Sequence, residues 1–172
     1  MALSLYDATV GTYMQILASI EGVLSKGREH CEANGIDLND VVETKLIDDM
    51  LPFRFQVISV AHHSLGAMKG VDAGEFGPPS MGDQDYGALQ ALVGEALAGL
   101  DDYSADKVNG FLGKEMVFKM GSMSMPFIAE DFLLTFSLPN FYFHATTTYD
   151  MIRMKGTTIG KRDFLGRMRL NM

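Results

Sequence analysis

Cysteine and tryptophan are nearly absent from this sequence. Its 172 residues include one cysteine, Cys31, and no tryptophan. A single cysteine cannot form an internal disulfide, so the fold does not depend on one and nothing indicates an oxidising compartment. No run approaches the roughly 18 apolar residues of a membrane-spanning helix, and the N-terminus lacks the basic segment of a secretory signal. These absences predict a cytoplasmic protein that is not inserted in a membrane.

Positive charge is also scarce. Lysine and arginine total 14 against 22 aspartate and glutamate residues, which gives a net charge of −8. Such a surface repels phosphate backbones and argues against nucleic-acid binding. The sequence has no phosphate-binding glycine-rich loop, no HExxH zinc motif and no GxSxG nucleophile elbow. Cys31 falls near the end of a predicted helix, where the helix dipole raises a thiol pKa, so a cysteine nucleophile is not expected.

Helical periodicity dominates what is present. The spacing of apolar residues predicts helices over about 4–34, 39–70 with an interruption at Pro52, 86–100 and 129–155. A loop is expected at 71–82, an irregular segment at 101–113 and an extended tail after 156. The clearest stripe alternates spacings of three and four and consists of Tyr6, Val10, Tyr13, Leu17, Ile20 and Leu24. We therefore predict an all-α protein, a single domain over residues 1–172 built as an antiparallel four-helix bundle with kinked helices.

Two features precede or belong to the last helix. Residues 115–120 and 125–128 flank a short polar stretch and predict a small β-hairpin, with Pro126 at a sheet edge. Pro139 is expected to kink the last helix or to start a new one at Asn140. Three consecutive aromatic residues, 141–143, then point in nearly every direction. A helix that is apolar all round belongs in a core or at a subunit interface, so we expect a homodimer.

Histidine supplies the remaining candidate chemistry. His144 lies in the apolar last helix, where an imidazole needs a partner to offset its burial. His63 shares a helical stripe with Gln56 and Asp49, although Asp49 and His63 are about 21 Å apart along a straight helix and cannot share an ion. His144 is either a buried structural residue or a metal ligand or general base. The predicted small-molecule pocket consists of His144, Gln56, Tyr142, Thr148 and Asp49.

Several segments together resemble a known family. They are PNFYFH at 139–144, followed by Tyr149 and Arg153, GKRDFLG at 160–166, DMLPF at 49–53, and Gln56. In these segments the sequence resembles a bacterial family of unknown function in the DinB/YfiT-like superfamily, whose members are regarded as metalloenzymes. The resemblance covers nearly the whole chain and implies a DinB-type four-helix bundle that is often dimeric.

The resemblance also implies a metal site, with a departure. In better-studied relatives three histidines bind a divalent metal, one from the second helix and two, spaced four apart, from a later helix. His144 matches one of the later pair, but Thr148 stands at its partner position and is a poor ligand. His62 or His63 matches the second-helix histidine. The resemblance therefore implies a degenerate zinc or nickel site held by His144 and His63. The alternative is a dimeric interaction protein without a metal.

Overall fold

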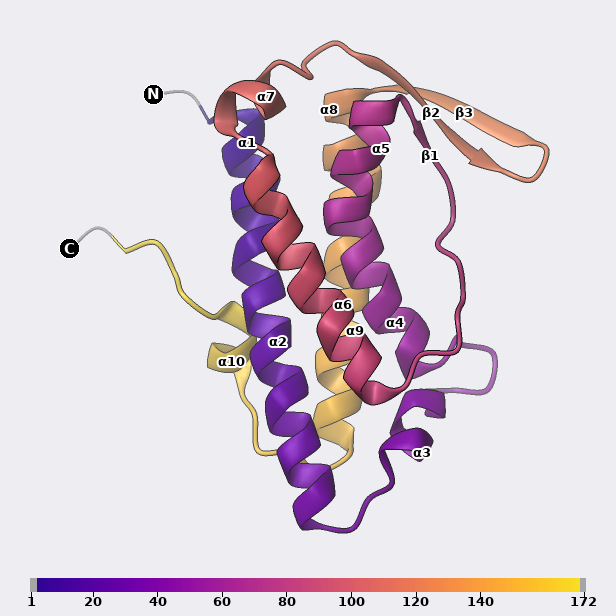
Figure 1. Ribbon diagram of the computed structural model, residues 1–172, viewed down its shortest axis with the longest axis vertical. Helices are drawn as coiled ribbons and strands as arrows, with labels where there is room; N and C mark the ends of the chain where they lie inside the picture. The colour runs from indigo at the N-terminus through magenta and orange to yellow at the C-terminus, as the bar shows by residue number, and fades with distance from the viewer. Residues whose placement is uncertain (1–2, 171–172) are drawn as a thin grey trace.

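The computed structural model describes residues 3–170 and is mostly helical, 64% of the chain. Four long helical segments lie side by side (Figure 1). They are α1 with α2 (Leu5–Ala8, Val10–Ala33), α4 with η1 and α5 (Phe53–Ala61, His62–Gly66, Ala67–Ala73), α6 with η2 (Tyr86–Gly99, Leu100–Asp102), and α8 with η3 and α9 (Ala129–Asp131, Phe132–Ser137, Leu138–Met154). Short helices α3 (Leu38–Glu43), α7 (Ala105–Asn109) and α10 (Lys161–Leu165) lie between or beyond them. The predicted helical fold is confirmed in this general form.

The direction of the helices follows from one long connection. Residues 74–85 return along the length of the molecule after α5, so that α4 and α6 point the same way while α2 and α9 point the opposite way (Figure 1). A short connection would instead have made α4 and α6 antiparallel neighbours. The same connection passes close to the side of α4, where it becomes part of the candidate site.

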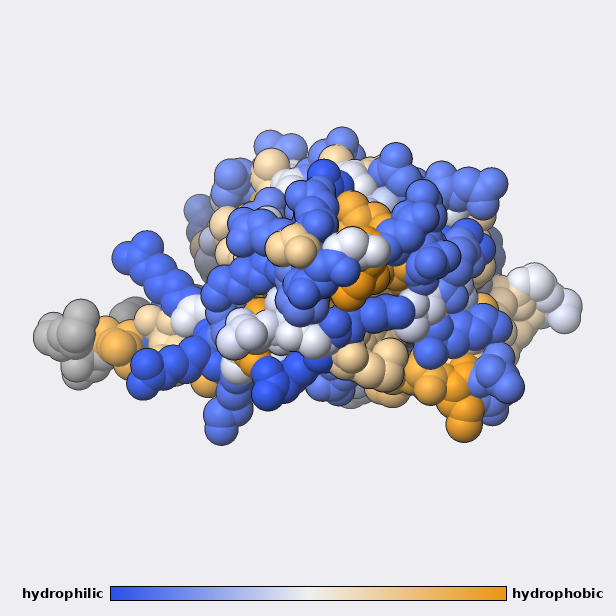
Figure 2. Space-filling view, turned by 90° about the horizontal axis from the view of Figure 1, so that it is seen from below, coloured by the Kyte–Doolittle hydropathy of each residue, from blue (hydrophilic) through white to orange (hydrophobic). Residues whose placement is uncertain are grey.

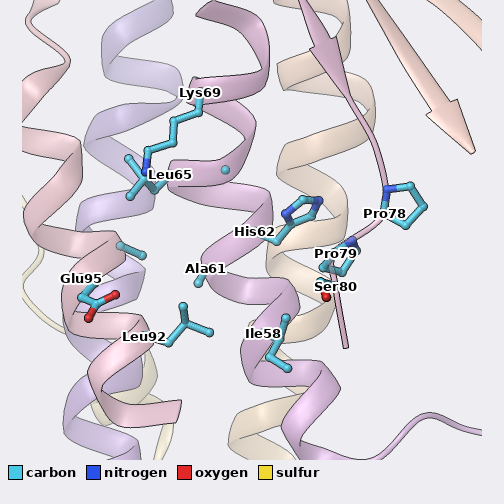
Figure 3. Close-up of a pocket in the computed structure, with 12 residues that line it drawn as sticks. Ile58, Ala61, His62, Leu65, Lys69, Pro78, Pro79, Ser80, Leu92 and Glu95 are labelled. Carbon is cyan, nitrogen blue, oxygen red and sulfur yellow. The ribbon is translucent and has the colours of Figure 1, made fainter. Parts of the chain in front are cut away.

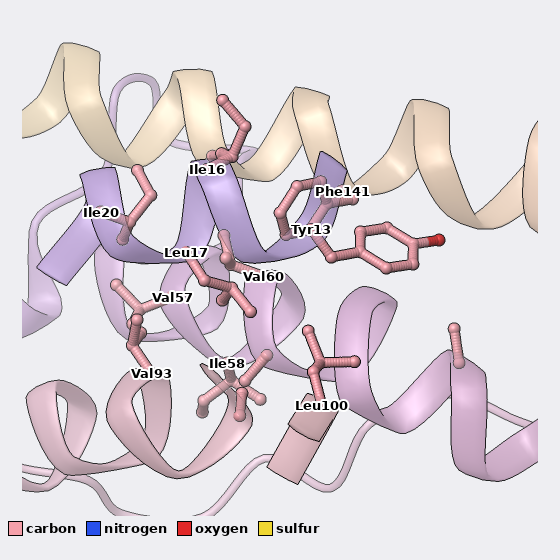
Figure 4. Packing of buried hydrophobic residues seen from close by; sticks show 14 of the residues in the cluster. Tyr13, Ile16, Leu17, Ile20, Val57, Ile58, Val60, Val93, Leu100 and Phe141 are labelled. Carbon is pink, nitrogen blue, oxygen red and sulfur yellow. The ribbon is translucent and has the colours of Figure 1, made fainter. Parts of the chain in front are cut away.

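The first helical segment begins and ends where the sequence predicts. The Ser4 hydroxyl accepts a hydrogen bond from the Asp7 backbone N–H at 3.1 Å and caps the helix. Gly35, with φ +66°, follows the helix end in the left-handed conformation that glycine favours. The predicted stripe is buried from Val10 to Leu24. Tyr13, Leu17 and Ile20 face the second and last helices in the core (Figure 4).

Two of the long segments contain a π-helical turn. The segment after Pro52, which is the N-cap of α4, continues through η1 to Ala73 instead of ending near residue 70. In the last segment η3 directly precedes Pro139, which occupies the first turn of α9. A proline ring lacks an N–H and collides with the carbonyl of the preceding turn, and the wider π turn offers room for it. Short π segments in helices occur frequently at functional sites.

A small sheet completes the fold and confirms the predicted hairpin. β2 (Glu115–Met120) pairs with β3 (Met123–Ile128) in antiparallel fashion, and β1 (Glu75–Phe76) pairs in parallel with β2. β3 begins two residues earlier than expected, because the loop is only residues 121–122 and Gly121 adopts φ +59°. β3 is the edge strand, where Pro126 is tolerated.

Other segments predicted to be irregular or extended contain short helices, α7 within residues 101–113 and α10 within the C-terminal tail. The tail returns to α2, where the Gln15 side-chain amide donates to the Leu165 carbonyl at 2.8 Å. Hydrophilic side chains cover most of the lower end of the molecule, with small apolar areas between them (Figure 2). Within residues 3–170, no helix combines the length and apolar character that crossing a membrane requires.

Candidate functional site

A polar layer lies between α4 and α9 in an otherwise apolar core. Gln56 on α4, His63 in η1 and His144 on α9 are each more than nine-tenths buried. Gln56 and His63 share one face of their helical segment because they are seven residues, or about two turns, apart. The antiparallel packing of α9 against α4 brings His144 to the same level. Burial of three polar side chains together requires that they satisfy one another or a ligand.

The hydrogen bonds of Gln56 fix the tautomer of His144. The Gln56 amide nitrogen donates to the Leu51 carbonyl at 2.9 Å, which assigns its oxygen as the atom that faces His144. The distance from that oxygen to His144 Nδ1 is 2.8 Å. Because an amide oxygen only accepts, Nδ1 carries the proton and Nε2 retains its lone pair. The ring is thus oriented as a hydrogen-bond acceptor at Nε2.

His63 continues the layer toward η3. Its ring is nearly parallel to that of His144, with an interplanar angle of 13° and 6.0 Å between ring centroids. The Ser137 hydroxyl donates to the His63 backbone carbonyl at 2.8 Å, which ties η3 to η1 where the π turn leaves helical hydrogen bonding irregular. His63 Nδ1 is buried and has no hydrogen-bond partner among the described residues. Such an atom calls for a ligand or a water molecule.

His62 extends the row of imidazoles to a cavity. Its ring centroid is 5.5 Å from that of His63, and it stacks on Phe76 at 4.3 Å. The Gly77 carbonyl accepts a hydrogen bond from His62 Nε2 at 2.7 Å. Since a carbonyl only accepts, Nε2 carries the proton and Nδ1 is left as an acceptor. His62 therefore joins the buried pair to the connection between β1 and α6.

The cavity has a volume of about 330 Å³ and lies between α4, η1, α6 and the segment 78–80 (Figure 3). This volume is at the lower end of the range typical of small-molecule sites, about 300–1,000 Å³. Apolar side chains form most of its wall, and Lys69 and Glu95 bring one charge of each sign. The lining residues are Ile58, Ala61, His62, Leu65, Gly66, Lys69, Pro78, Pro79, Ser80, Leu92, Glu95 and Ala96.

Burial keeps all three imidazoles neutral. It lowers the pKa of His63 to about 3, an effect to which the neighbouring His62 and His144 rings add by charge repulsion. Burial alone lowers the pKa of His144 to about 4. The pKa of His62 is also lowered by burial, against the opposing effect of its bond to Gly77. At neutral pH the row therefore offers lone pairs and no positive charge.

The family model described as "domain of unknown function (DUF1993)" matches residues 5–165. The chain belongs to the DUF1993 family. A solved structure, a DinB family member protein from Shewanella denitrificans, is similar in fold, with a TM-score of 0.78 and 22% sequence identity. The match covers 98% of this chain and 95% of that one. The search of curated proteins found no match.

The metal site that the resemblance implies can be compared with the residues of this DUF1993 protein. His63 and His144 could supply two nitrogen ligands, and Gln56 orients His144 as an outer-shell partner orients a metal ligand. Within residues 3–170, however, no group of three His, Cys, Asp or Glu side chains is placed to hold a metal ion. Zinc sites use three or four protein ligands, so the residues present do not fit a conventional zinc or nickel site.

The predicted pocket residues of this DUF1993 protein fall into two groups. Gln56 and His144 form one hydrogen-bonded pair, with His63 beside it. Asp49 lies in an exposed turn outside α4, Tyr142 is exposed on α9, and Thr148 is buried with a hydroxyl that has no hydrogen-bond partner in the described part of the chain. None of the hydrogen bonds within residues 3–170 joins these three side chains to His144.

Sequence reasoning did not find the cavity beside His62. His62 is adjacent to His63, and one residue step along a helix separates their side chains by about 100°. The sequence therefore predicts that only one of the two faces the site. The structure uses both, because one ring faces the polar layer and the other lines the cavity. The prolines of segment 78–80 predict a loop, but they do not predict which helix this loop lies against. Gly66, four residues after His62, was the available signal for a close approach to that ring.

Proposed function

We propose that this protein binds a small organic molecule in the cavity beside His62, with the polar layer of His63, His144 and Gln56 behind it. The bound molecule has an apolar body and carries an uncharged hydrogen-bond donor such as a hydroxyl or an amide N–H. The observation that supports this most directly is Nδ1 of His62, an acceptor that no hydrogen bond within residues 3–170 uses, at the wall of a cavity of about 330 Å³.

Gly66 supports the accessibility of that nitrogen. A Cβ atom placed on Gly66 would lie 3.1 Å from His62 Nδ1 and 3.6 Å from its Cγ. Because glycine has no Cβ, the side of the ring that carries Nδ1 stays open toward the cavity, which Gly66 also lines. The φ of Gly66 is −59°, which any residue adopts in a helix. Backbone conformation therefore does not require a glycine here.

The neutral state of the three imidazoles supports an uncharged hydrogen-bond donor as the ligand. A His62 ring whose pKa is lowered by burial stays uncharged at neutral pH and accepts a hydrogen bond at Nδ1. The charges at the cavity, Lys69 and Glu95, balance one another, so neither strong anions nor strong cations are favoured. The remaining wall is apolar and accommodates a hydrocarbon or ring portion.

The substitution Gly66→Ala tests this proposal without threatening the fold. The new methyl group blocks Nδ1. A helical Gly→Ala change ordinarily stabilises by up to about 1 kcal/mol, from which the cost of moving the His62 ring by a few tenths of an ångström is subtracted. We expect small alcohols and primary amides that shift the His62 ring signals in NMR to bind the variant at least about tenfold more weakly, the loss of one hydrogen bond.

Gly22→Ala is the matched control, because Gly22 is helical and a Cβ there meets nothing within 4 Å. It should leave binding unchanged. Molecules of the same size that only accept hydrogen bonds, such as esters and ketones, cannot bond to Nδ1 and should lose less affinity than alcohols in the Gly66→Ala variant. Equal losses for donors and acceptors, or equal binding of alcohols by the Gly66→Ala variant and the wild type, would refute the proposed recognition at Nδ1.

The exposed aromatic residues of α9 favour a second property, self-association as a homodimer. Tyr142 and Phe143 are exposed in the first half of α9, and Leu134 is exposed in the preceding η3. Exposed apolar groups that sit together commonly form interfaces between copies of a chain. We propose that this face of α9 pairs with its equivalent in a second copy.

Light scattering after size-exclusion chromatography measures this directly. We expect a mass of twice the 18.9 kDa chain for the wild type and of one chain for Phe143→Lys. Leu112→Lys, which places the same charge at another exposed apolar position, serves as a control for nonspecific effects of charge and surface. A wild-type mass of one chain at high protein concentration would exclude the dimer.

A further inference from the structure

The β2–β3 hairpin gathers methionine side chains on one face. Partners directly opposite one another on antiparallel strands share a face, and so do alternate residues of a strand. The register pairs Met120 with Met123 and Phe118 with Met125. Met120, Met123 and Met125 therefore project from the same face at the tip of the hairpin, with the Phe118 ring beneath them toward the bundle.

The tight turn holds these three side chains together. The loop is only residues 121–122, and Gly121, with φ +59°, matches the first central residue of a type II′ turn. Opposite residues at such a turn have Cβ atoms about 5 Å apart, and alternate residues of one strand are roughly 7 Å apart. A methionine side chain has three rotatable bonds, so three thioether sulfurs at these spacings can reach one point.

Packing explains the inner half of this face but not its tip. Near the bundle, Phe118 contacts Phe136 at 5.0 Å between ring centroids, and Phe127 contacts Phe132 at 5.8 Å. Toward the turn the hairpin extends beyond the helices (Figure 1). There Met120 and Met123 are 49% and 39% exposed, and Met125 is partly exposed. Met120 and Met123 thus face solvent, whereas Met125 is partly buried and packs against the edge of the core.

We propose that Met120, Met123 and Met125 form a binding site for a soft monovalent metal ion, Cu(I) in the cell or Ag(I) as its chemical analogue. Thioether sulfur is a soft ligand that selects Cu(I) over the hard and borderline divalent ions. The three sulfurs provide a trigonal set without any charged ligand. This site is independent of the cavity beside His62 and of the ligand proposed for it.

The surrounding charge suits a cation. Lys119, between Phe118 and Met120, points to the opposite face of β2 because side chains alternate along a strand. Its ammonium group is paired there with the Glu75 carboxylate at 2.5 Å. The protein as a whole carries a net charge of −8, which attracts cations. No like charge therefore faces the three sulfurs from either strand of the hairpin.

Methionine to leucine substitution separates metal binding from packing. Leucine keeps the apolar area and nearly the volume of methionine but has no sulfur, so Met120→Leu, Met123→Leu and Met125→Leu together should leave the hairpin folded. The matched control replaces three other exposed methionines, Met81→Leu, Met154→Leu and Met168→Leu.

The readout is NMR of the protein labelled with ¹³C in the methionine ε-methyl groups, titrated with silver nitrate, which needs no reductant. We expect the methyl signals of Met120, Met123 and Met125 to shift together along one saturating curve that ends near one Ag(I) per chain. Binding at the buried thiol of Cys31 would leave these three signals in place. In the control variant the three signals should shift as in the wild type.

Two outcomes would overturn the proposal. One is the absence of a shift in the three signals at several equivalents of Ag(I). The other is a shift of similar size and affinity in Met81, Met154 and Met168, which would mean that any exposed thioether responds. A wild-type titration that the hairpin triple variant reproduces by calorimetry, with the same stoichiometry, would likewise place the bound metal elsewhere.

Discussion

At pH 5 the protein is expected to be about 2–4 kcal/mol less stable toward unfolding than at pH 7, because His63 and His144 must stay neutral in the folded state. In the unfolded chain their pKa is near 6.5, whereas folding lowers it to about 3 for His63 and about 4 for His144. Below pH 6.5 the unfolded state therefore binds more protons. The free energy of unfolding has its full value above pH 6.5. It decreases as the pH falls toward the folded-state pKa values of about 4 and 3. Urea unfolding at pH 7, 6 and 5 measures this slope.

The substitution His63→Leu tests how much of this loss of stability at low pH comes from His63. His63 Nδ1 has no hydrogen-bond partner, so an apolar side chain of similar size should change stability at pH 7 by no more than about 1 kcal/mol. It should also remove about half of the loss between pH 7 and pH 5. An unchanged slope in this variant would show that other groups produce the acid sensitivity. The variant retains the His144–Gln56 bond, so the remaining loss reports on His144 and on His62, whose pKa burial also lowers.

The helices were predictable from the sequence because one-sided apolar periodicity determines which face a helix buries. The buried stripe from Val10 to Leu24 can be predicted without knowing which helices it packs against. Ser4 and Gly35 mark the start and end of their own helix through local interactions. The π turns η1 and η3 were not predictable in the same way. The two turns meet at a contact between distant segments, where the Ser137 hydroxyl donates to the His63 carbonyl, and that contact joins residues 74 positions apart.

The candidate site was predictable only in part for a related reason. The seven-residue spacing of Gln56 and His63 placed both on one helix face, and the apolar surroundings of His144 indicated a buried imidazole. Asp49 followed the same spacing but lies in a turn, because the helix begins only after Pro52. The cavity depends on where residues 78–80 lie against η1. That placement is set by the return of a long connection, about which local sequence says little.

The three consecutive aromatic residues of α9 give the largest expected single-substitution effect. Phe141→Ala should lower the free energy of unfolding by about 3–5 kcal/mol, since it empties a fully buried site in the core. The Phe141 ring meets Tyr13 edge-on, with 4.9 Å between centroids, and so joins α9 to α2 (Figure 4). Urea unfolding of the purified variant at pH 7 measures the loss.

Phe143→Ala is the matched control, two residues along the same helix. Its side chain is 57% exposed, so a monomer should lose no more than about 0.5 kcal/mol. If Phe143 instead lies in a dimer interface, the loss will grow with protein concentration, because association stabilises only the folded state. The Phe141→Ala loss arises within one chain and should be the same at every concentration. Measuring both variants at two concentrations thus distinguishes a core residue from an interface residue on one helix.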